Sequence, residues 1–156
     1  EKISELAVTI PIESIDSFTR TPLMHACRAL QEKSAETLLS LGAKPNAQDA
    51  WGNTAASFAC SQKGGSKVLQ TLLNHGADIN LPDEELRTPL HKAFKAQDIE
   101  CVDLLLSYGA DPHAKDRHGK TPMQTSEEGQ FSPSWFQITD ARIGQKTLTL
   151  RTIRED

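Results

Sequence analysis

Three cysteines are the most reactive side chains in this sequence, but their spacing does not fit the usual chemistry of clustered thiols. Cys27, Cys60 and Cys101 form no CxxC pair and do not match the ligand spacing of a zinc site. An odd, unpaired number of thiols favours a reducing compartment such as the cytosol or the nucleus. Because a free cysteine packs as a small hydrophobic residue, we expect these thiols to be buried.

Histidines and glycines do not indicate a catalytic or metal site either. His75, His113 and His118 lie in separate predicted turns, and Gly64-Gly65 lacks the Lys-Ser/Thr that completes a phosphate-binding P-loop. No nucleophile with a base and no pair of carboxylates has a credible spacing. The sequence therefore predicts a protein that is not an enzyme, with no catalytic residue, metal, cofactor or small-molecule substrate.

The elements that position these side chains are short helices in pairs. In residues 88–111, Thr88 and Pro89 predict a helix start, because Thr can cap the helix and Pro needs no N–H at its first position. Apolar residues at helical spacing follow, then an interruption at residues 96–98, then a second apolar stripe that stops at Gly109. The segment is predicted to be helix, tight turn, helix and glycine stop.

This unit recurs along the chain at nearly constant spacing. It begins at Thr21, Thr54, Thr88 and Thr121, which are 33, 34 and 33 residues apart. The second helices of the first three units end in the same Leu-Leu-x-x-Gly-Ala pattern. Helices this short cannot bury their apolar faces as an isolated pair, so each unit needs neighbours. The sequence resembles the ankyrin repeat family, whose unit is about 33 residues long and begins with a TPLH-type motif.

The resemblance implies an all-α repeat solenoid built from helix–turn–helix units with hairpin turns. Three full repeats and a truncated fourth are expected over residues 13–130. Residues 1–12 are expected to form an N-terminal capping segment, either helical or extended. Residues 131–156 form a C-terminal extension, in which residues 135–138 and 147–153 have the pattern of two strands, as in a β-hairpin.

Three positions are notable within the repeats. His91 is the fourth residue of the TPLH motif, where the resemblance implies that it bonds the backbone and holds neighbouring units together. Leu86 departs from the family pattern, which has Gly at that turn position. Gly64 and Gly65 lie in an inter-helix loop that is one residue longer than its counterparts, and we expect this loop to be the most mobile of its kind.

The resemblance also indicates where a partner would bind, because ankyrin proteins use a concave face lined by the hairpin tips and the outward side of each first helix. Five such positions in each of four units carry six Arg or Lys and three Glu, a net charge of +3 against −4 for the whole chain. An exposed Trp flanked by Arg is typical of interface hot spots. The predicted partner-binding residues are Phe18, Arg20, Arg28, Trp51, Asn53, Gln62, Arg87, Lys95, Arg117, His118 and Lys120.

We therefore expect a scaffold or adaptor that binds a peptide segment or another protein. Its partner would place an apolar or aromatic group against Trp51 and acidic or phosphorylated groups near Arg20, Arg28 and Arg87. The alternative is an intramolecular docking or assembly element of a larger multidomain regulator or enzyme, since the chain begins at Glu1 and not at Met.

The charge and hydropathy of the chain bear on location and on other partners. The modest negative charge gives no basic footprint for nucleic acid. No apolar run is long enough for a membrane span, and no signal segment is visible. We expect an intracellular protein, cytoplasmic or nuclear, that binds neither nucleic acid nor membranes.

Overall fold

The fold is an array of paired helices. The structure is a computed structural model that describes residues 11–126. Within these residues the chain forms helices and no strand, so the predicted all-α repeat architecture is confirmed. The predicted β-hairpin and all but the last two residues of the predicted capping segment lie outside the described residues. The elements are α2 (Pro22–Arg28), α3 (Glu32–Ser40), α4 (Ala55–Cys60), α5 (Ser66–Asn74), α6 (Pro89–Ala96), α7 (Ile99–Ser107) and the 3-10 helix η1 (Met123–Thr125).

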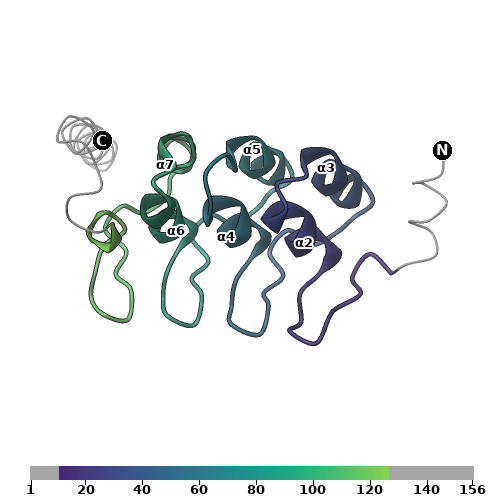
Figure 1. The fold of residues 1–156 in the computed structure, drawn as a ribbon, viewed down its shortest axis with the longest axis horizontal. Coiled ribbons are helices and arrows are strands. Elements are labelled where there is room, and N and C mark those ends of the chain that lie inside the picture. Colours follow the sequence, from purple (N-terminus) through teal and green to yellow (C-terminus); the bar gives the residue numbers. More distant parts are fainter. Residues whose placement is uncertain (1–10, 127–156) are drawn as a thin grey trace, which may run out of the picture.

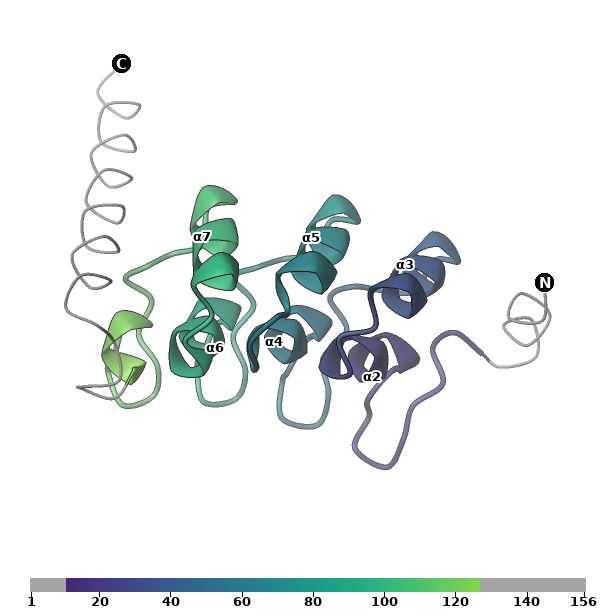
Figure 2. The same cartoon turned by 45° about the horizontal axis from the view of Figure 1, so that its top comes forward.

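The helices lie in two rows. In Figure 1, α2, α4 and α6 form one row and α3, α5 and α7 form the other, while η1 continues the first row. Neighbours within a row pack against each other, as α2 does with α4 and α3 with α5. The long loops that precede α2, α4, α6 and η1 all project to the same side, which the tilted view in Figure 2 also shows. These loops are the predicted hairpin turns.

Threonine caps explain why the first helix of each unit begins where it does. The Thr21 hydroxyl accepts a hydrogen bond from the Met24 N–H at 3.3 Å, and the Thr54 hydroxyl accepts one from the Ser57 N–H at 3.2 Å. Pro follows the cap in α2 and α6 but not in α4. The helix in the second unit forms in the same register without proline, so the capping hydroxyl is the shared start signal.

The core lies between the two rows and is formed by small and branched apolar side chains. Leu23, Leu69, Leu90 and Leu105 are each no more than 1% exposed. Alanines fill the first row where helices approach each other closely, as Ala59 does in α4 with no exposed surface. Each helix pair completes its core only against the next pair, as the repeat pattern predicted.

The three thiols belong to this core, which confirms the prediction that they are buried. Cys27, Cys60 and Cys101 are free cysteines with no exposed surface. Burial raises the pKa of Cys27 to about 12. A hydrogen bond with the Cys101 side chain, together with burial, raises the pKa of Cys60 well above its ordinary value. Cys27 and Cys60 are therefore protonated at neutral pH, and all three cysteines act as packing groups in the core.

The loop with two glycines forms hydrogen bonds with the following repeat, and its greater mobility stays a prediction. Gly64 and Gly65 donate their N–H groups to Asp98 Oδ2 at 2.9 and 3.4 Å. The other Asp98 oxygen caps α7 by accepting from the Cys101 N–H at 3.2 Å. A Cβ on Gly65 would lie 1.8 Å from the Ala59 carbonyl oxygen. Glycine is thus required there because the loop packs directly on α4.

We predict that the native protein does not react with a thiol reagent such as dithionitrobenzoate under non-denaturing conditions at mildly alkaline pH. Burial excludes the reagent from all three thiols, and the raised pKa of Cys27 and Cys60 means that little of the reactive thiolate forms there. After unfolding in urea, all three cysteines should react. Release of one or more equivalents of chromophore from the native protein faster than it unfolds would contradict the burial of these thiols.

A candidate protein-binding face at the hairpin turns

An aspartate shapes each hairpin turn, and it is buried in the second, third and fourth turns. In the second repeat, Asp49 Oδ1 accepts hydrogen bonds from the N–H groups of Trp51 at 2.9 Å and Asn53 at 2.8 Å. The same two bonds, to the second and fourth residues after the aspartate, recur in the other repeats. The equivalent aspartates are Asp16, Asp83 and Asp116. One carboxylate oxygen thus fixes the direction in which each tip projects.

Backbone hydrogen bonds join neighbouring tips into one row. Each tip donates the N–H that follows its aspartate to a carbonyl of the preceding tip, at 2.9–3.0 Å. The pairs are Ala50 to Phe18, Glu84 to Trp51 and Arg117 to Glu85. The tip side chains of adjacent repeats are therefore held side by side, in a register set by main-chain bonds.

The third turn keeps this geometry although it lacks the expected glycine. Leu86 has a φ of +58°, in the left-handed region, and Thr19 has a φ of +57° at the equivalent position of the first repeat. Gly52 and Gly119 fill this position in the other two turns. The departure from the family pattern is therefore accommodated as strain in the backbone and not as a different turn.

Two aromatic rings and one guanidinium form a cluster at the tips of the first two repeats. The rings of Phe18 and Trp51 are stacked with centroids 5.3 Å apart, and each residue is 45% exposed. The Arg20 guanidinium lies 4.9 Å from the Phe18 ring centroid and 5.5 Å from that of Trp51. It also lies 5.9 Å from the ring of Phe58 on α4. We call Phe18, Arg20, Trp51 and Phe58 the aromatic cluster.

The cation of Arg20 is largely used within this cluster. Its Nε lies 3.9 Å from Asp49 Oδ2, and within residues 11–126 this Nε is buried without a hydrogen-bond partner. Stacking of a guanidinium on rings is favourable without a counter-ion. Arg20 therefore serves mainly to hold the two exposed rings in place, and less as the free anion-binding group that the sequence suggested.

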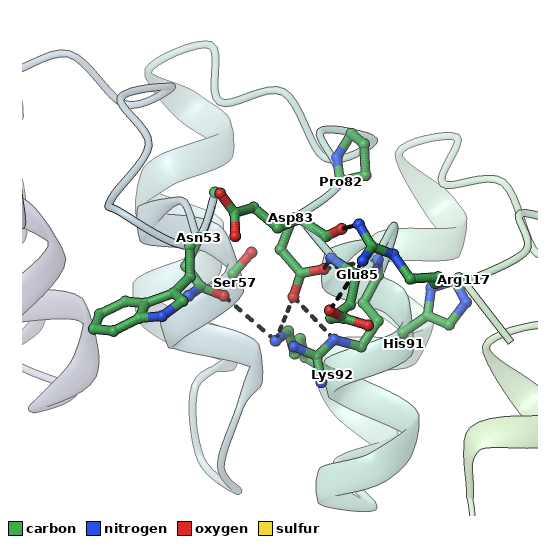
Figure 3. Close-up of polar contacts among 12 residues, drawn as sticks. Asn53, Ser57, Pro82, Asp83, Glu85, His91, Lys92 and Arg117 are labelled. Atoms are coloured by element: carbon green, nitrogen blue, oxygen red, sulfur yellow. Dashed lines mark hydrogen bonds and ion pairs between the residues drawn. The ribbon is translucent and has the colours of Figure 1, made fainter.

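A second cluster ties the second repeat to the third (Figure 3). Asp83, whose side chain is 1% exposed, accepts hydrogen bonds at Oδ2 from Arg87 Nε at 3.0 Å and Lys92 Nζ at 2.9 Å. Lys92 Nζ also donates to Asn53 Oδ1 at 3.4 Å. Burial alone would raise the pKa of Asp83, but the hydrogen bonds from Lys92 and Arg87 outweigh it and lower the pKa. Asp83 thus stays ionised inside the turn.

Lys92 was not among the residues predicted from the sequence. Its position in the repeat, relative to the capping threonine, could have identified it. Lys92 is the fourth residue after the capping Thr88, so it lies on the side of α6 that faces the turn aspartate. His25 holds the same register in the first repeat, and its Nε2 lies 3.0 Å from Asp16 Oδ2. The predicted partner-binding residues did not include this position, because they were chosen only at the hairpin tips and at the ends of the first helices.

His91 joins the third repeat to the fourth, as the family resemblance implied. It is 1% exposed, and its Nδ1 accepts a hydrogen bond from the Thr88 N–H at 3.0 Å. Nε2 therefore carries the proton and donates to the Lys120 carbonyl oxygen at 3.1 Å. Burial lowers the pKa of His91, so the ring is neutral at physiological pH. This is a structural hydrogen-bonding role.

The structure separates the remaining predicted residues into engaged and exposed groups. Arg117 donates from Nη2 to the Glu84 carbonyl oxygen at 2.7 Å and pairs with Glu85 at 3.7 Å. Gln62 donates to the Arg28 carbonyl oxygen across the first two repeats. The predicted residues whose positions are exposed overall are Phe18, Arg28, Trp51, Gln62, Lys95, Arg117, His118 and Lys120. Arg20, Asn53 and Arg87 are half-buried and take part in the contacts given above.

Two further observations concern other kinds of site. Among residues 11–126, no group of three or more His, Cys, Asp or Glu side chains is placed to hold a metal ion. In the same part of the chain, no helix has both the length and the apolar character needed to cross a bilayer.

Stacked helix pairs with hydrogen-bonded hairpin tips define a repeat solenoid. Models of this class match the chain: "Ankyrin repeat" matches residues 19–50 and "Ankyrin repeats (3 copies)" matches residues 43–116. The chain belongs to the ankyrin repeat family. Ankyrin repeats are protein–protein interaction modules, and the ankyrin repeat scaffolds that it resembles are typically not enzymes.

Curated relatives share the repeats over part of their length. Inversin of Canis lupus familiaris is 38% identical over 91 residues, which are 58% of this chain and 8% of the relative. NF-kappa-B inhibitor delta of Mus musculus is 40% identical over 79 residues, 49% of this chain and 24% of the relative. The nuclear factor NF-kappa-B p105 subunit of Rattus norvegicus is 33% identical over 90 residues, 56% of this chain and 9% of the relative.

We predict that Leu86→Gly stabilises the protein by about 0.5–1 kcal/mol, because glycine removes the cost of a left-handed backbone at a side chain while adding unfolded-state entropy. Leu86→Ala is the matched control, since it also removes the half-exposed side chain but keeps a Cβ. Urea unfolding followed by circular dichroism measures both. A Gly variant no more stable than the Ala variant would show that the turn carries no strain.

We predict that Asp83→Asn lowers the free energy of unfolding by about 2 kcal/mol at neutral pH, because Lys92 and Arg87 lose their ionised partner. The folded-state pKa of Asp83 lies below its ordinary value. Its contribution is therefore complete above the ordinary carboxyl pKa and is lost as the pH falls through the lowered value. The gap between wild type and variant should begin to close below about pH 5, near the ordinary carboxyl pKa, and close further as the pH falls.

Urea unfolding at several pH values measures this gap, and Glu85→Gln serves as the control. Glu85 is half-buried overall, and its 3.7 Å pair with Arg117 is exposed, so its loss should cost less than about 1 kcal/mol. A gap between wild type and Asp83→Asn that stays constant from neutral to acidic pH would show that the ionised form of Asp83 is not the stabilising one.

Proposed function

We propose that this chain is a protein-interaction module whose concave face binds a segment of another protein. The observation that carries the proposal is the aromatic cluster, in which Phe18 and Trp51 stack on each other while each remains 45% exposed. A turn tip has little core for these rings to fill, so their exposure is not a by-product of packing. Exposed aromatic and arginine side chains are the residue types enriched in interface hot spots.

The cluster is also well prepared for binding. The Asp49 carboxylate accepts the Trp51 N–H, and main-chain hydrogen bonds join the two tips, so the backbone beneath both rings is fixed. The Arg20 guanidinium lies against both rings. Side chains that are already ordered lose little further freedom when a partner binds. The group that fits against the rings is apolar or aromatic, and acidic or phosphorylated groups of the same partner would lie near basic side chains of this face.

A second candidate function is an intramolecular docking or assembly element of a larger regulator or enzyme. It is favoured by the lengths of the curated relatives, of which the matched segments are only 8–24%. In either case the module binds and carries out no reaction of its own. Three buried free cysteines support the intracellular location, cytoplasmic or nuclear, that the odd cysteine count suggested.

Trp51→Ala is the test of this proposal. Partners are captured from cell lysate with the wild-type chain, identified by mass spectrometry, and then titrated as purified proteins against each variant. Trp51→Ala should weaken the binding of a specific partner by about 2 kcal/mol or more, because it removes the central anchor. This corresponds to a factor of about 30 in the dissociation constant. Circular dichroism must show that the variant keeps its fold.

Tyr108→Ala provides the matched control on the other row of helices. Tyr108 follows α7 and is 50% exposed, so it is an aromatic side chain of similar accessibility away from the tips. Its removal should leave partner affinity unchanged. If the partners bind Trp51→Ala as tightly as wild type, the aromatic cluster is not the anchor and the proposal fails.

A further inference from the structure

We infer that the concave face carries a second subsite, a basic pocket between the third and fourth repeats that binds one anionic side chain of a partner peptide. This inference rests on the proposed function, because it supplies the second contact of a peptide anchored at the aromatic cluster. The chemistry that the pocket would recognise is a carboxylate or a phosphate. The sequence predicted the anion near Arg20, Arg28 and Arg87. Arg20 contacts the aromatic cluster and Arg87 binds Asp83, so the pocket instead offers the lysines beside Arg87.

The pocket has a volume of about 610 Å³ and is bounded by the third and fourth turns, α6 and η1. Four of its lining residues are Arg or Lys and two are acidic, which gives a net charge of +2 in a chain whose total is −4. The basic residues are Arg87, Lys92, Lys95 and Lys120, and the acidic residues are Glu85 and Asp116. The pocket is thus opposite in sign to the protein as a whole.

Contacts within the protein use both acidic residues of the pocket. Glu85 pairs with Arg117 at 3.7 Å, and Asp116 Oδ1 accepts the N–H groups of His118 and Lys120 at 2.9 Å. Asp83, which lies outside the lining, balances one of the two cations that bind it, Arg87 or Lys92. Counting Arg117 and Asp83 together with the lining leaves the net charge at +2.

Two lysines supply most of the unbalanced charge. Lys95 and Lys120 are exposed, and among residues 11–126 neither has an acidic side chain within 4.0 Å. Lys92 adds a donor, because its ammonium has three N–H groups and contacts two acceptors within residues 11–126, Asp83 Oδ2 and Asn53 Oδ1. A carboxylate or phosphate in the pocket would meet donors that the fold has not used.

The size and charge of the pocket favour a single anionic side chain over a nucleic acid. A duplex or single strand presents many phosphates and is bound by many cations, whereas only two lysines are unbalanced here. The protein's total charge of −4 would also repel an extended polyanion. The row of tips continues from the pocket to the aromatic cluster through the bond from the Glu84 N–H to the Trp51 carbonyl. An extended peptide could therefore contact both.

The test uses the full chain labelled with nitrogen-15 and three short probes. The probes are the capped peptides Gly-Gly-Xaa-Gly-Gly in which Xaa is phosphoserine, glutamate or serine. The phosphoserine probe, the glutamate probe or both should shift the amide resonances of residues around the pocket, with saturation at millimolar concentration, while the serine probe should not. The two anionic arms show whether phosphate or carboxylate is preferred.

Paired lysine variants locate the binding. Lys95→Gln/Lys120→Gln should lower the affinity for the anionic probes about tenfold, because two charge-assisted contacts are lost. Lys33→Gln/Lys67→Gln removes the same charge from exposed positions on α3 and α5, and its affinity should stay as in wild type. Circular dichroism shows whether each variant is folded.

Several outcomes would overturn the inference. These are equal shifts with the serine probe, shifts spread over lysines outside the pocket, or unchanged affinity in Lys95→Gln/Lys120→Gln. Tighter binding of a random-sequence oligonucleotide than of the phosphoserine probe would overturn the assignment to a peptide. The probes carry no apolar side chain, so Trp51→Ala should bind them normally. Failure of this pocket is therefore separate from failure of the aromatic cluster as an anchor.

Discussion

The buried turn aspartate is the interaction on which the rest of this structure depends. Each hairpin reverses direction within four residues, and one carboxylate oxygen accepts two N–H groups that the reversal leaves without backbone partners. Asp49, Asp83 and Asp116 are each less than 9% exposed, and such burial is tolerable for a carboxylate only when it is hydrogen-bonded or paired. Without these bonds the tips would not be held in one conformation, and the N–H and carbonyl groups that join neighbouring tips would not be aligned.

The same turns separate residues that maintain the fold from residues that are free to bind. The aspartate and the capping threonine use their polar groups internally, so substitution there affects the whole array. The two residues that follow the aspartate contribute backbone groups to the turn, and most of their side chains project from the row of tips, although Arg117 also bonds the preceding tip. This division explains how Phe18, Trp51 and His118 can occupy one equivalent position with different chemistry while the turn stays the same.

Local signals in the sequence were sufficient for the fold, but only part of the candidate site followed from them. Thr88 caps, Gly109 ends a helix, and the 33-residue spacing needs no knowledge of distant contacts. The pairing of Arg87 and Lys92 with Asp83, and of Arg20 with two rings, depends on side chains brought together by folding. The residue type at one position could not show which Arg and Lys side chains pair with an acidic side chain in the folded protein. The role of Asp98 in holding the glycine loop, 33 to 34 residues earlier, was hidden for the same reason.

One variable position in the repeat contributes to the change from an aromatic surface in the first two repeats to a basic surface in the third. In the first three repeats the fourth residue after the capping threonine contacts a turn residue, and the fold accepts several side chains there. Phe58 extends the aromatic cluster in the second repeat, whereas Lys92 brings a cation to the third and pairs with its turn aspartate. His25 bonds the turn aspartate of the first repeat, and Thr125 bonds only main-chain carbonyls. Because this residue contacts a turn in the first three repeats, its identity sets the local surface while the repeat stays the same, and one scaffold presents an apolar region beside a basic one.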